Sequence, residues 1–473
     1  MRLVSARENT WNMEKTSQRG ILVVDVGYTN SKAVLFDQEL RLVAERKMAS
    51  VHKSGSLYNV LDPEPFASFL QKAIPELDAI MPIGCIVPCA HGAAMALLKS
   101  DGSLAMPIMD YMSAPPAEIV AEFSKQQPPF SEVYCGLLPQ ALTHGLQLFW
   151  QKRLDAAAFA ETITILPLIQ FWGFLLSGKR CCEISSLACQ TMLLDVNTGA
   201  PSSLAVGEGI APLLAPMRKA WDPLGPCLPK FGLKREVPVL AGVHDSNANY
   251  LRYLAAGLSD FSLLSTGTWS ICFNGAAEIS KLDPTRDTNT NTSVFGKAVA
   301  CSRFFAGKEL EIISAGANAE EANLEVVQDL VRRGTFALPS FTDSGGPLPG
   351  TGGKGRLVGP ALSTPAERGS MAVLYCALMV SCQMDLVQSQ NQIIVDGPFS
   401  WNPLFMQILA QLRPTQKVFA SDEHNGTATG AACLALIENG ALPVRPLALH
   451  AVSPTEFAGL AAYTESWFNQ IAR

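Results

Sequence analysis

Blocks of apolar residues, separated by glycine, proline and polar residues, predict alternating strands and helices along the chain. Residues 21–37, with the sequence ILVVDVGYTNSKAVLFD, begin apolar, become polar after Gly27 and end apolar. This pattern predicts a strand, a tight turn and a second strand, and residues 42–51 predict a third strand. The chain is therefore expected to open with a β-hairpin and a neighbouring strand.

The later blocks predict the remaining elements in the same way. Residues 163–176 form one strongly apolar element that ends at a glycine, and residues 347–359, rich in glycine and proline, predict a surface loop. We predict further strands at 83–88, 237–242, within 261–273 and from 392, helices at 63–74, 142–153, 370–390, 403–412 and 431–439, and one or two helices after 446.

The turn of the opening hairpin carries groups that bind an anion. Gly27 allows backbone N–H groups to approach a phosphate closely. The spacing fits neither a P-loop nor a dinucleotide-binding turn, because a single glycine is followed by a strand rather than a helix. An ordinary hairpin with a polar loop remains the alternative. The side chains that add donors at the turn are Thr29, Asn30, Ser31 and Lys32.

One acidic residue, Asp25, ends the first strand of this hairpin. A carboxylate in that position is better suited to ordering Mg²⁺ and its water molecules than to contacting phosphate directly.

A second hairpin of the same design occurs at residues 261–273, with the sequence FSLLSTGTWSICF. An apolar strand leads to hydroxyl residues around Gly267 and Thr268, and a second apolar strand follows. Two such hairpins in the two halves of one chain suggest a duplicated domain that holds a nucleotide between its copies.

Three strand ends carry further candidate chemistry. Asp245 follows a buried strand and precedes a helix, so it could serve as a general base or as a helix N-cap. His91 follows the strand at 83–88 and could bind a sugar hydroxyl or be a structural histidine, and Asp110 extends the same candidate wall. Gly397 ends a strand, and Asn402 before Pro403 predicts an N-cap, which makes this turn a candidate seat for a nucleoside or its phosphates.

Composition narrows the function classes. A chain of 473 residues is long enough for two or three domains, and 48% hydrophobic with 16% charged residues is enough to form their cores. The net charge of −6 argues against nucleic acid or an anionic membrane surface as partner. Twelve cysteines without a C-x-x-C pair indicate neither zinc nor disulfides, so we expect a reducing, cytoplasmic setting. The polar first twenty residues lack a signal-peptide pattern, and the longest apolar run, 371–382, is too short to span a membrane.

Together these segments resemble the FGGY carbohydrate kinases. The likeness covers residues 21–436 and lies in the order of four motifs: DVGYTNSKAVLFD, GVHDSNANY, LLSTGTWS and VDGPFSWNPLFMQILA. The resemblance implies an α/β fold of two actin-like (ribonuclease H-like) ATPase domains with an interdomain cleft. It implies a disordered extension at 1–19, a sugar-binding domain at 20–256 and a nucleotide-binding domain at 257–473.

The family pattern also implies roles for individual residues. It implies that Asp245 is the general base, that Asp25 positions Mg²⁺, and that ATP donates a phosphate to a ketose, either a pentulose or a 6-deoxy-ketohexose such as rhamnulose or fuculose, or to a related polyol. The residues implied to lie near the nucleotide are Gly27, Thr29, Asn30, Lys32, Gly267, Thr268, Gly397 and Asn402. The residues implied to lie near the sugar are His91, Asp110, His244 and Asp245.

Two departures from the family pattern affect the nucleotide site. Lys32 stands where many members have arginine, and Pro398 stands where a second glycine is common, which removes one backbone N–H. Two other functions therefore remain as alternatives: an actin-like scaffold in which ATP drives conformation, and a degenerate kinase homologue that senses a sugar. The sequence leaves the oligomeric state open, with a homodimer as one option.

Overall fold

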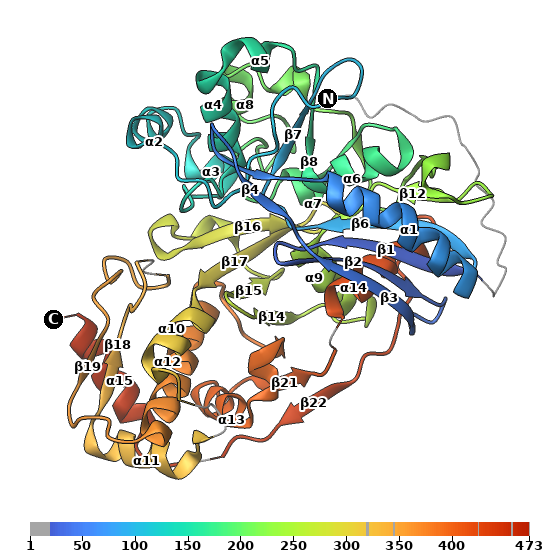
Figure 1. Cartoon of the computed structure of the whole chain (residues 1–473). Coiled ribbons are helices and arrows are strands. Elements are labelled where there is room, and N and C mark those ends of the chain that lie inside the picture. The colour runs from blue at the N-terminus through green and yellow to red at the C-terminus, as the bar shows by residue number, and fades with distance from the viewer. Residues whose placement is uncertain (1–18, 318–320, 344–345, 424, 456, 473) are drawn as a thin grey trace. The chain divides into compact units, whose positions relative to one another are not determined.

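The computed structural model describes residues 19–317, 321–343, 346–423, 425–455 and 457–472 (Figure 1). The expected extension at 1–19 therefore lies, except for Arg19, outside the described residues. Contacts divide the chain into two compact units. Of the described residues, the first unit comprises those up to 257 together with 291–298 and 425–445. The second comprises the described residues of 258–290, 299–423 and 446–472.

The first unit is built on a seven-stranded mixed sheet. Its strand order is β11-β12-β6-β1-β2-β3, and β13 also pairs with β6. The strands β1 and β2 form the opening hairpin, β3 continues it antiparallel, and β6 and β12 run parallel to β1. Their bounds are β1 Gly20–Val26, β2 Asn30–Phe36, β3 Leu42–Ala49, β6 Ile83–Ala90, β11 Pro223–Pro226, β12 Pro238–Leu240 and β13 Val243–His244.

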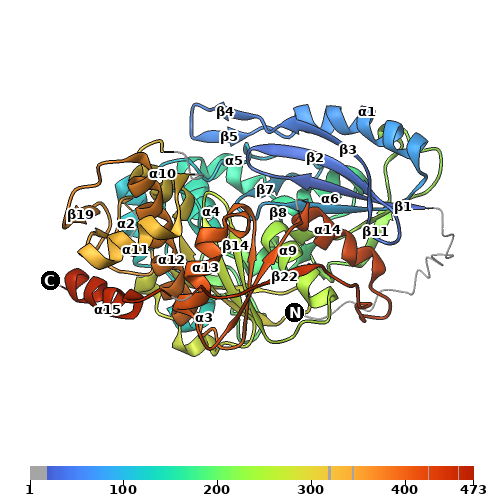
Figure 2. The ribbon, with the colours of Figure 1, turned by 90° about the horizontal axis from the view of Figure 1, so that it is seen from below.

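Helices cover both faces of this sheet because its central strands are apolar on both sides. Along β1, Leu22 and Val24 belong to the core that includes the apolar residues of α1 (Glu64–Ile80) and α6 (Leu168–Ser177). The alternate residues Ile21 and Val23 belong to the core on the other face. That core includes apolar residues of α9 (Asp245–Ala255) and α14 (Gly426–Ala432). Figure 2 shows α1 on one side of β1–β3 and α14 on the other.

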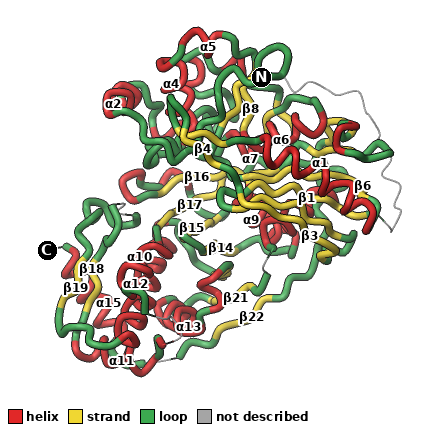
Figure 3. Tube along the Cα trace, in the orientation of Figure 1, coloured by secondary structure: helices red, strands yellow, loops and turns green. Residues whose placement is uncertain are grey.

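The second unit repeats this topology. Its seven-stranded sheet has the order β16-β17-β15-β14-β20-β21-β22 (Figure 3). The hairpin β14–β15 is antiparallel, β17 adds antiparallel, β20 and β21 run parallel to β14, and β22 is antiparallel. The same arrangement of directions around the hairpin confirms the predicted duplication. The bounds are β14 Phe261–Thr266, β15 Ser270–Asn274, β16 Thr288–Thr292, β17 Ala298–Phe304, β20 Gln392–Asp396, β21 Lys417–Ser421 and β22 Leu449–Val452.

The long helix α12 (Pro365–Leu386) forms the centre of the second unit. It packs against α10, α11 and α13, and Thr364 and Glu367 form a capping box at its start. Among the described residues it is the one helix long and apolar enough to cross a membrane, and 83% of its most apolar window is buried inside the protein. Burial to that extent is typical of a core helix. The bounds of these helices are α10 Ala306–Ser314, α11 Leu324–Arg333 and α13 Pro403–Leu412, and α15 Leu460–Ile471 packs against β18.

Shorter elements complete the two units. The remaining helices are α2 Ala117–Ser124, α3 Phe130–Val133, α4 His144–Leu154, α5 Ala156–Ala160, α7 Ile184–Leu187 and α8 Ser203–Gly207. The remaining strands are β4 His52–Ser54, β5 Asn59–Leu61, β7 Met95–Leu98, β8 Thr164–Pro167, β9 Cys182–Glu183, β10 Met217–Arg218, β18 Phe336–Leu338 and β19 Arg356–Val358.

Several predicted elements differ from the structure. The loop expected at 347–359 contains the strand β19. The apolar element at 163–176 is a strand, β8, followed directly by α6, since a continuous apolar run does not distinguish the two states. The tail after residue 446 begins with the strand β22 rather than a helix. The helix expected at 431–439 starts earlier, at Gly426, and a short 3₁₀ turn follows it.

The helices α9 and α14 approach each other unusually closely at Gly430. A Cβ atom on Gly430 would overlap the backbone carbonyl of Ala248 in α9. The packing of α14 against α9 therefore depends on the missing side chain.

We expect Gly430→Ala to lower the free energy of unfolding by about 2 kcal/mol or more, because the overlapped atom is backbone and cannot move aside. Gly207→Ala is the matched control, since a Cβ on the exposed Gly207 meets nothing within 4 Å. Urea unfolding of both variants measures the difference. Equal stabilities of the two variants would contradict this account of the helix contact.

Candidate functional site

Three parallel strands of the first unit end side by side. In the ladder, Val26 of β1 pairs with Ala90 of β6, which in turn pairs with His244 of β13. The residues that follow these strands are Gly27, His91 and Asp245. The three predicted site residues therefore begin the loops at one edge of the sheet, and the His91 N–H donates to the Val26 carbonyl over 3.1 Å.

Asp25 lies one pair deeper in the same ladder, beside Lys32. The two residues are direct partners across the antiparallel hairpin, so their side chains share the face covered by α9 and α14. The Lys32 Nζ is 3.7 Å from Asp25 Oδ2 and donates to Asn425 Oδ1 over 3.0 Å. Burial raises the pKa of Asp25 to about 6, the Lys32 charge opposes this, and the charge of Asp245 adds to it.

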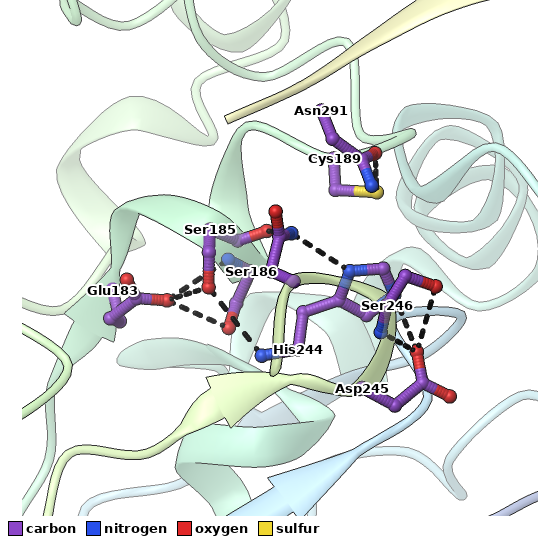
Figure 4. A network of polar contacts seen from close by, with 9 residues as sticks. Glu183, Ser185, Ser186, Cys189, His244, Asp245, Ser246 and Asn291 are labelled. Atoms are coloured by element: carbon purple, nitrogen blue, oxygen red, sulfur yellow. Dashed lines mark hydrogen bonds and ion pairs between the residues drawn. The ribbon is translucent and has the colours of Figure 1, made fainter. Parts of the chain in front are cut away.

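Asp245 occupies the first turn of α9, after His244 as the N-cap residue. Its Oδ1 accepts hydrogen bonds from the backbone N–H and hydroxyl of Ser246, over 2.5 and 3.1 Å, and lies 3.1 Å from His244 Nε2 (Figure 4). The side chain is 32% exposed. Desolvation by the surrounding protein still raises its pKa to about 6, and the Ser246 hydrogen bonds oppose that rise.

His91 presents an unused hydrogen-bonding atom. Its Nδ1 is buried and has no protein partner. Burial lowers the pKa of His91 to about 3, so the ring is neutral at physiological pH. The rings of Tyr28 and Tyr111 each stand edge-on to it, with ring centroids 6.0 Å away. A buried polar atom beside aromatic rings is suited to a hydroxyl-rich ligand.

Asp110, the second residue expected near a sugar, is engaged by the protein itself. Its Oδ2 is 2.7 Å from His52 Nδ1 and accepts from the Tyr28 hydroxyl over 3.3 Å, and its Oδ1 accepts from the Met112 N–H. The carboxylate is buried, and Tyr28 has a pKa raised to about 12 by desolvation and by the Asp110 charge. Asp110 therefore helps to hold the Tyr28 ring beside His91.

The second hairpin has a shorter loop than the first. Between the last paired residues, residues 27–30 form the loop of the first hairpin and residues 267–269 that of the second. Thr268 is exposed at its tip, and a Cβ on Gly267 would meet nothing within 4 Å. Gly307 supports the loop from behind, because a Cβ there would lie 2.5 Å from the Gly267 carbonyl oxygen.

Gly397 forms a turn beside this loop in the same unit. Its φ of 85° with ψ of −167° is accessible to glycine alone, and a Cβ would overlap the Thr266 carbonyl. The Thr266 hydroxyl donates to the Asp396 carbonyl and accepts from the Phe399 N–H, over 2.6 and 3.1 Å. This hydroxyl thereby holds the turn that carries Pro398.

Pro398 and Asn402, which follow this turn, each stand at the start of a helical segment. Pro398 is the first residue of a 3₁₀ turn, where a backbone N–H would have no partner within the turn. The Asn402 side chain accepts from the Phe405 N–H and caps α13, as the Asn-Pro sequence predicts. Gly267, Thr268 and Gly397 form the glycine-lined end of the second sheet.

The residues of the first hairpin turn divide into two groups. Thr29 and Asn30 are exposed at the tip, whereas Lys32 is held between Asp25 and Asn425. Sequence reasoning missed the contribution of His52, whose only signal is a histidine just after the third strand. It also gave Gly307 no role, since a single glycine in the sequence FFAG carries no spacing motif.

The described residues contain no group of three or more His, Cys, Asp or Glu side chains that could hold a metal ion by themselves. Mg²⁺ at sites of phosphoryl transfer is commonly held by one or two carboxylates together with substrate phosphates and water. Asp25, a buried carboxylate at the end of β1, fits such a role.

Comparison with known proteins identifies the family. The FGGY carbohydrate kinase C-terminal domain model matches residues 258–443. A sequence search of curated proteins found no match. Among solved structures, a carbohydrate kinase from Novosphingobium aromaticivorans is 31% identical with a TM-score of 0.87, covering 96% of this chain and 99% of the other.

Two further structures share the fold at lower identity. The xylulose kinase from Rhodospirillum rubrum is 19% identical with a TM-score of 0.79, covering 96% of this chain and 98% of the other. The Plasmodium falciparum glycerol kinase with ADP is 15% identical with a TM-score of 0.76 and the same coverage. On the match at 31% identity and the family model, this chain belongs to the FGGY carbohydrate kinase family and is a sugar kinase built from two actin-like domains.

Proposed function

We propose that this sugar kinase transfers the γ-phosphate of ATP to a terminal hydroxyl of a ketose, a pentulose or 6-deoxy-ketohexose, or of a related polyol, with Asp245 as the general base. The observation that carries the proposal is the common edge at which Asp245 and His91 begin neighbouring loops. Neighbouring structures include xylulose, gluconate and glycerol kinases, which are named for polyhydroxylated substrates.

The proposed base has a suitable proton affinity. A pKa of about 6 leaves most of the Asp245 carboxylate ionised at neutral pH, while it binds a proton more readily than a solvated carboxylate. His91 Nδ1 and the rings of Tyr28 and Tyr111 supply polar and flat apolar surfaces for the sugar. Asp110 accepts hydrogen bonds that help to position the Tyr28 ring and His52.

The nucleotide is assigned to the glycine-lined end of the second sheet. The open space at Gly267 admits a phosphate against the backbone, and Thr268 and Gly397 flank the same end. In the first unit, Gly27, Thr29, Asn30 and Lys32 surround the hairpin turn, where Asp25 would help to hold Mg²⁺. When bound, the ion would neutralise charge on the transferring phosphate.

Substituting the proposed base tests the mechanism. We expect Asp245→Asn to lower sugar-dependent ADP release at least roughly a hundredfold, because no carboxylate remains to accept the hydroxyl proton. The readout is a coupled ADP assay over a panel of ketoses and alditols, with Mg-ATP binding as the control for an intact nucleotide site. Turnover like that of the unmodified enzyme would overturn the assignment.

The same substitution has a predicted effect on stability. The folded-state pKa of Asp245, about 6, is above the ordinary aspartate value of 3.8. Its ionised form therefore costs stability above pH 6, and the cost disappears as the pH falls toward 4. Allowing for partial exposure, Asp245→Asn should be more stable than the native protein by about 1 kcal/mol at pH 8. Thermal unfolding at pH 8 and pH 4 measures this, and a gap that does not narrow at pH 4 would contradict it.

Gly267 offers a test of the nucleotide site that leaves the fold intact. We expect Gly267→Ala to raise the KM for ATP roughly tenfold, since the new methyl occupies space assigned to phosphate, while the melting temperature stays unchanged because the methyl meets no protein atom. Gly207→Ala is the control for glycine replacement. An unchanged KM for ATP would contradict the assignment of a phosphate to this loop. If the native protein did not bind Mg-ATP at all, the degenerate, sugar-sensing alternative raised by Pro398 would be favoured.

A further inference from the structure

A buried network connects the first turn of α7 to Asp245 (Figure 4). Glu183, fully buried before α7, accepts hydrogen bonds at Oε2 from the Ser185 hydroxyl over 2.6 Å and from the Ser186 N–H over 3.1 Å. The Ser185 hydroxyl in turn accepts the His244 N–H over 3.4 Å. The backbone N–H of His244 is thus bound into this network.

The amide of Asn247 determines which ring nitrogen of His244 carries a proton. Asn247 Nδ2 is 3.3 Å from the Ser185 carbonyl oxygen and 3.1 Å from His244 Nδ1. A carbonyl oxygen only accepts, so the atom facing it must be the amide nitrogen. That nitrogen has a second hydrogen to give to His244 Nδ1, which must therefore be an acceptor. The ring proton then lies on Nε2.

The Nε2 atom of His244 faces the proposed base. It lies 3.1 Å from Asp245 Oδ1. The histidine side chain is only 5% exposed, and a Cβ on Gly92 would lie 2.6 Å from Cδ2 and Nε2 of its ring. The ring is therefore held between Gly92 and Asn247, with little surface left for a substrate.

We propose that His244 is a positioning residue. Asn247 keeps it in the Nε2–H tautomer, and His244 Nε2 then donates a hydrogen bond to Asp245. This bond fixes the direction in which the Asp245 carboxylate accepts the substrate proton. The inference rests on the proposed function of Asp245. It assigns His244 a role through Asp245 instead of the direct sugar contact that its position beside the motif suggested. Donation to the ionised carboxylate also favours the charged form of Asp245.

Two matched substitutions test this role. Glutamine places an amide N–H near the position of Nε2, whereas asparagine reaches only as far as Nδ1. We expect His244→Asn to lower kcat roughly tenfold and to move the acidic limb of kcat/KM to higher pH. His244→Gln should keep kcat within about threefold of the native value and leave the acidic limb of kcat/KM near its native pH. Asp25, which interacts electrostatically with Asp245, and Glu183 are unchanged in both variants.

Several results of the kinetic test would contradict the role proposed for His244, and they can be told apart. Native kcat and an unmoved acidic limb in His244→Asn would overturn the positioning role, as would equal losses in both variants with unchanged pH profiles. A rise in the sugar KM alone would return His244 to direct substrate binding. If Asp245→Asn retains turnover, the proposed base itself fails; if Asp245→Asn is inactive and His244→Asn is native-like, only the present inference fails.

A spectroscopic measurement tests the tautomer without any assay of activity. The chain has six histidines, so ¹⁵N-imidazole NMR of the full-length protein can identify the His244 signal by its loss in His244→Gln. We expect a neutral Nε2–H ring from pH 6 to 8, consistent with a pKa lowered to about 4 by burial, and a mixture of tautomers in Asn247→Leu. An Nδ1–H ring, or titration near pH 6.5, would overturn the assignment.

Discussion

The parallel pairing of β6 with β1 on one side and β13 on the other is the constraint on which the candidate site depends. Because the strands run in the same direction and end in register, Gly27, His91 and Asp245 begin their loops at one edge, although 64 and 154 positions separate them along the chain. Two apolar helical layers, one on each face of the sheet, hold that register. A one-residue slip of β1 would exchange its buried faces, so the core and the site are specified together.

The same strand pairing brings two carboxylates, Asp25 and Asp245, to this edge of the sheet. Asp25 and Asp245 both have pKa values raised to about 6 by desolvation, and Lys32 next to Asp25 opposes the rise there. Burying two carboxylates near one another costs stability, and the roles proposed for them, a proton acceptor and a ligand for a cation, would account for that cost. In the role proposed for His244, the network that begins at Glu183 would hold the Asp245 carboxylate in a defined direction.

The duplicated sheets have diverged at their hairpins. The position two residues before the hairpin glycine is Asp25 in the first unit and Ser265 in the second, and the second loop is one residue shorter. Gly27 is required by the chain itself, since a Cβ would lie 2.6 Å from the Asn30 carbonyl oxygen, whereas Gly267 faces open space. One topology thus supplies an acidic turn in one unit and an uncharged, open turn in the other.

The sequence predicted the hairpins, their duplication and the Asn402 cap, because each depends on local periodicity and turn chemistry. It could not distinguish β8 from α6 within one apolar run, and it missed β22, whose partner β21 lies across a helix. The sequence could not predict the tautomer of His244 either, because the tautomer depends on Asn247 and Ser185, two residues on different helices. The pairing of Asp110 with His52 depends on tertiary contact in the same way.

The most direct test of this account is a crystal structure with ADP, Mg²⁺ and the ketose or alditol that gives the highest turnover in a coupled ADP-release screen. The account predicts one substrate hydroxyl within hydrogen-bond distance, about 2.6–3.2 Å, of the Asp245 carboxylate, with His244 Nε2 still donating to Oδ1. A substrate whose hydroxyls all lie beyond direct or single-water reach of Asp245 would contradict it.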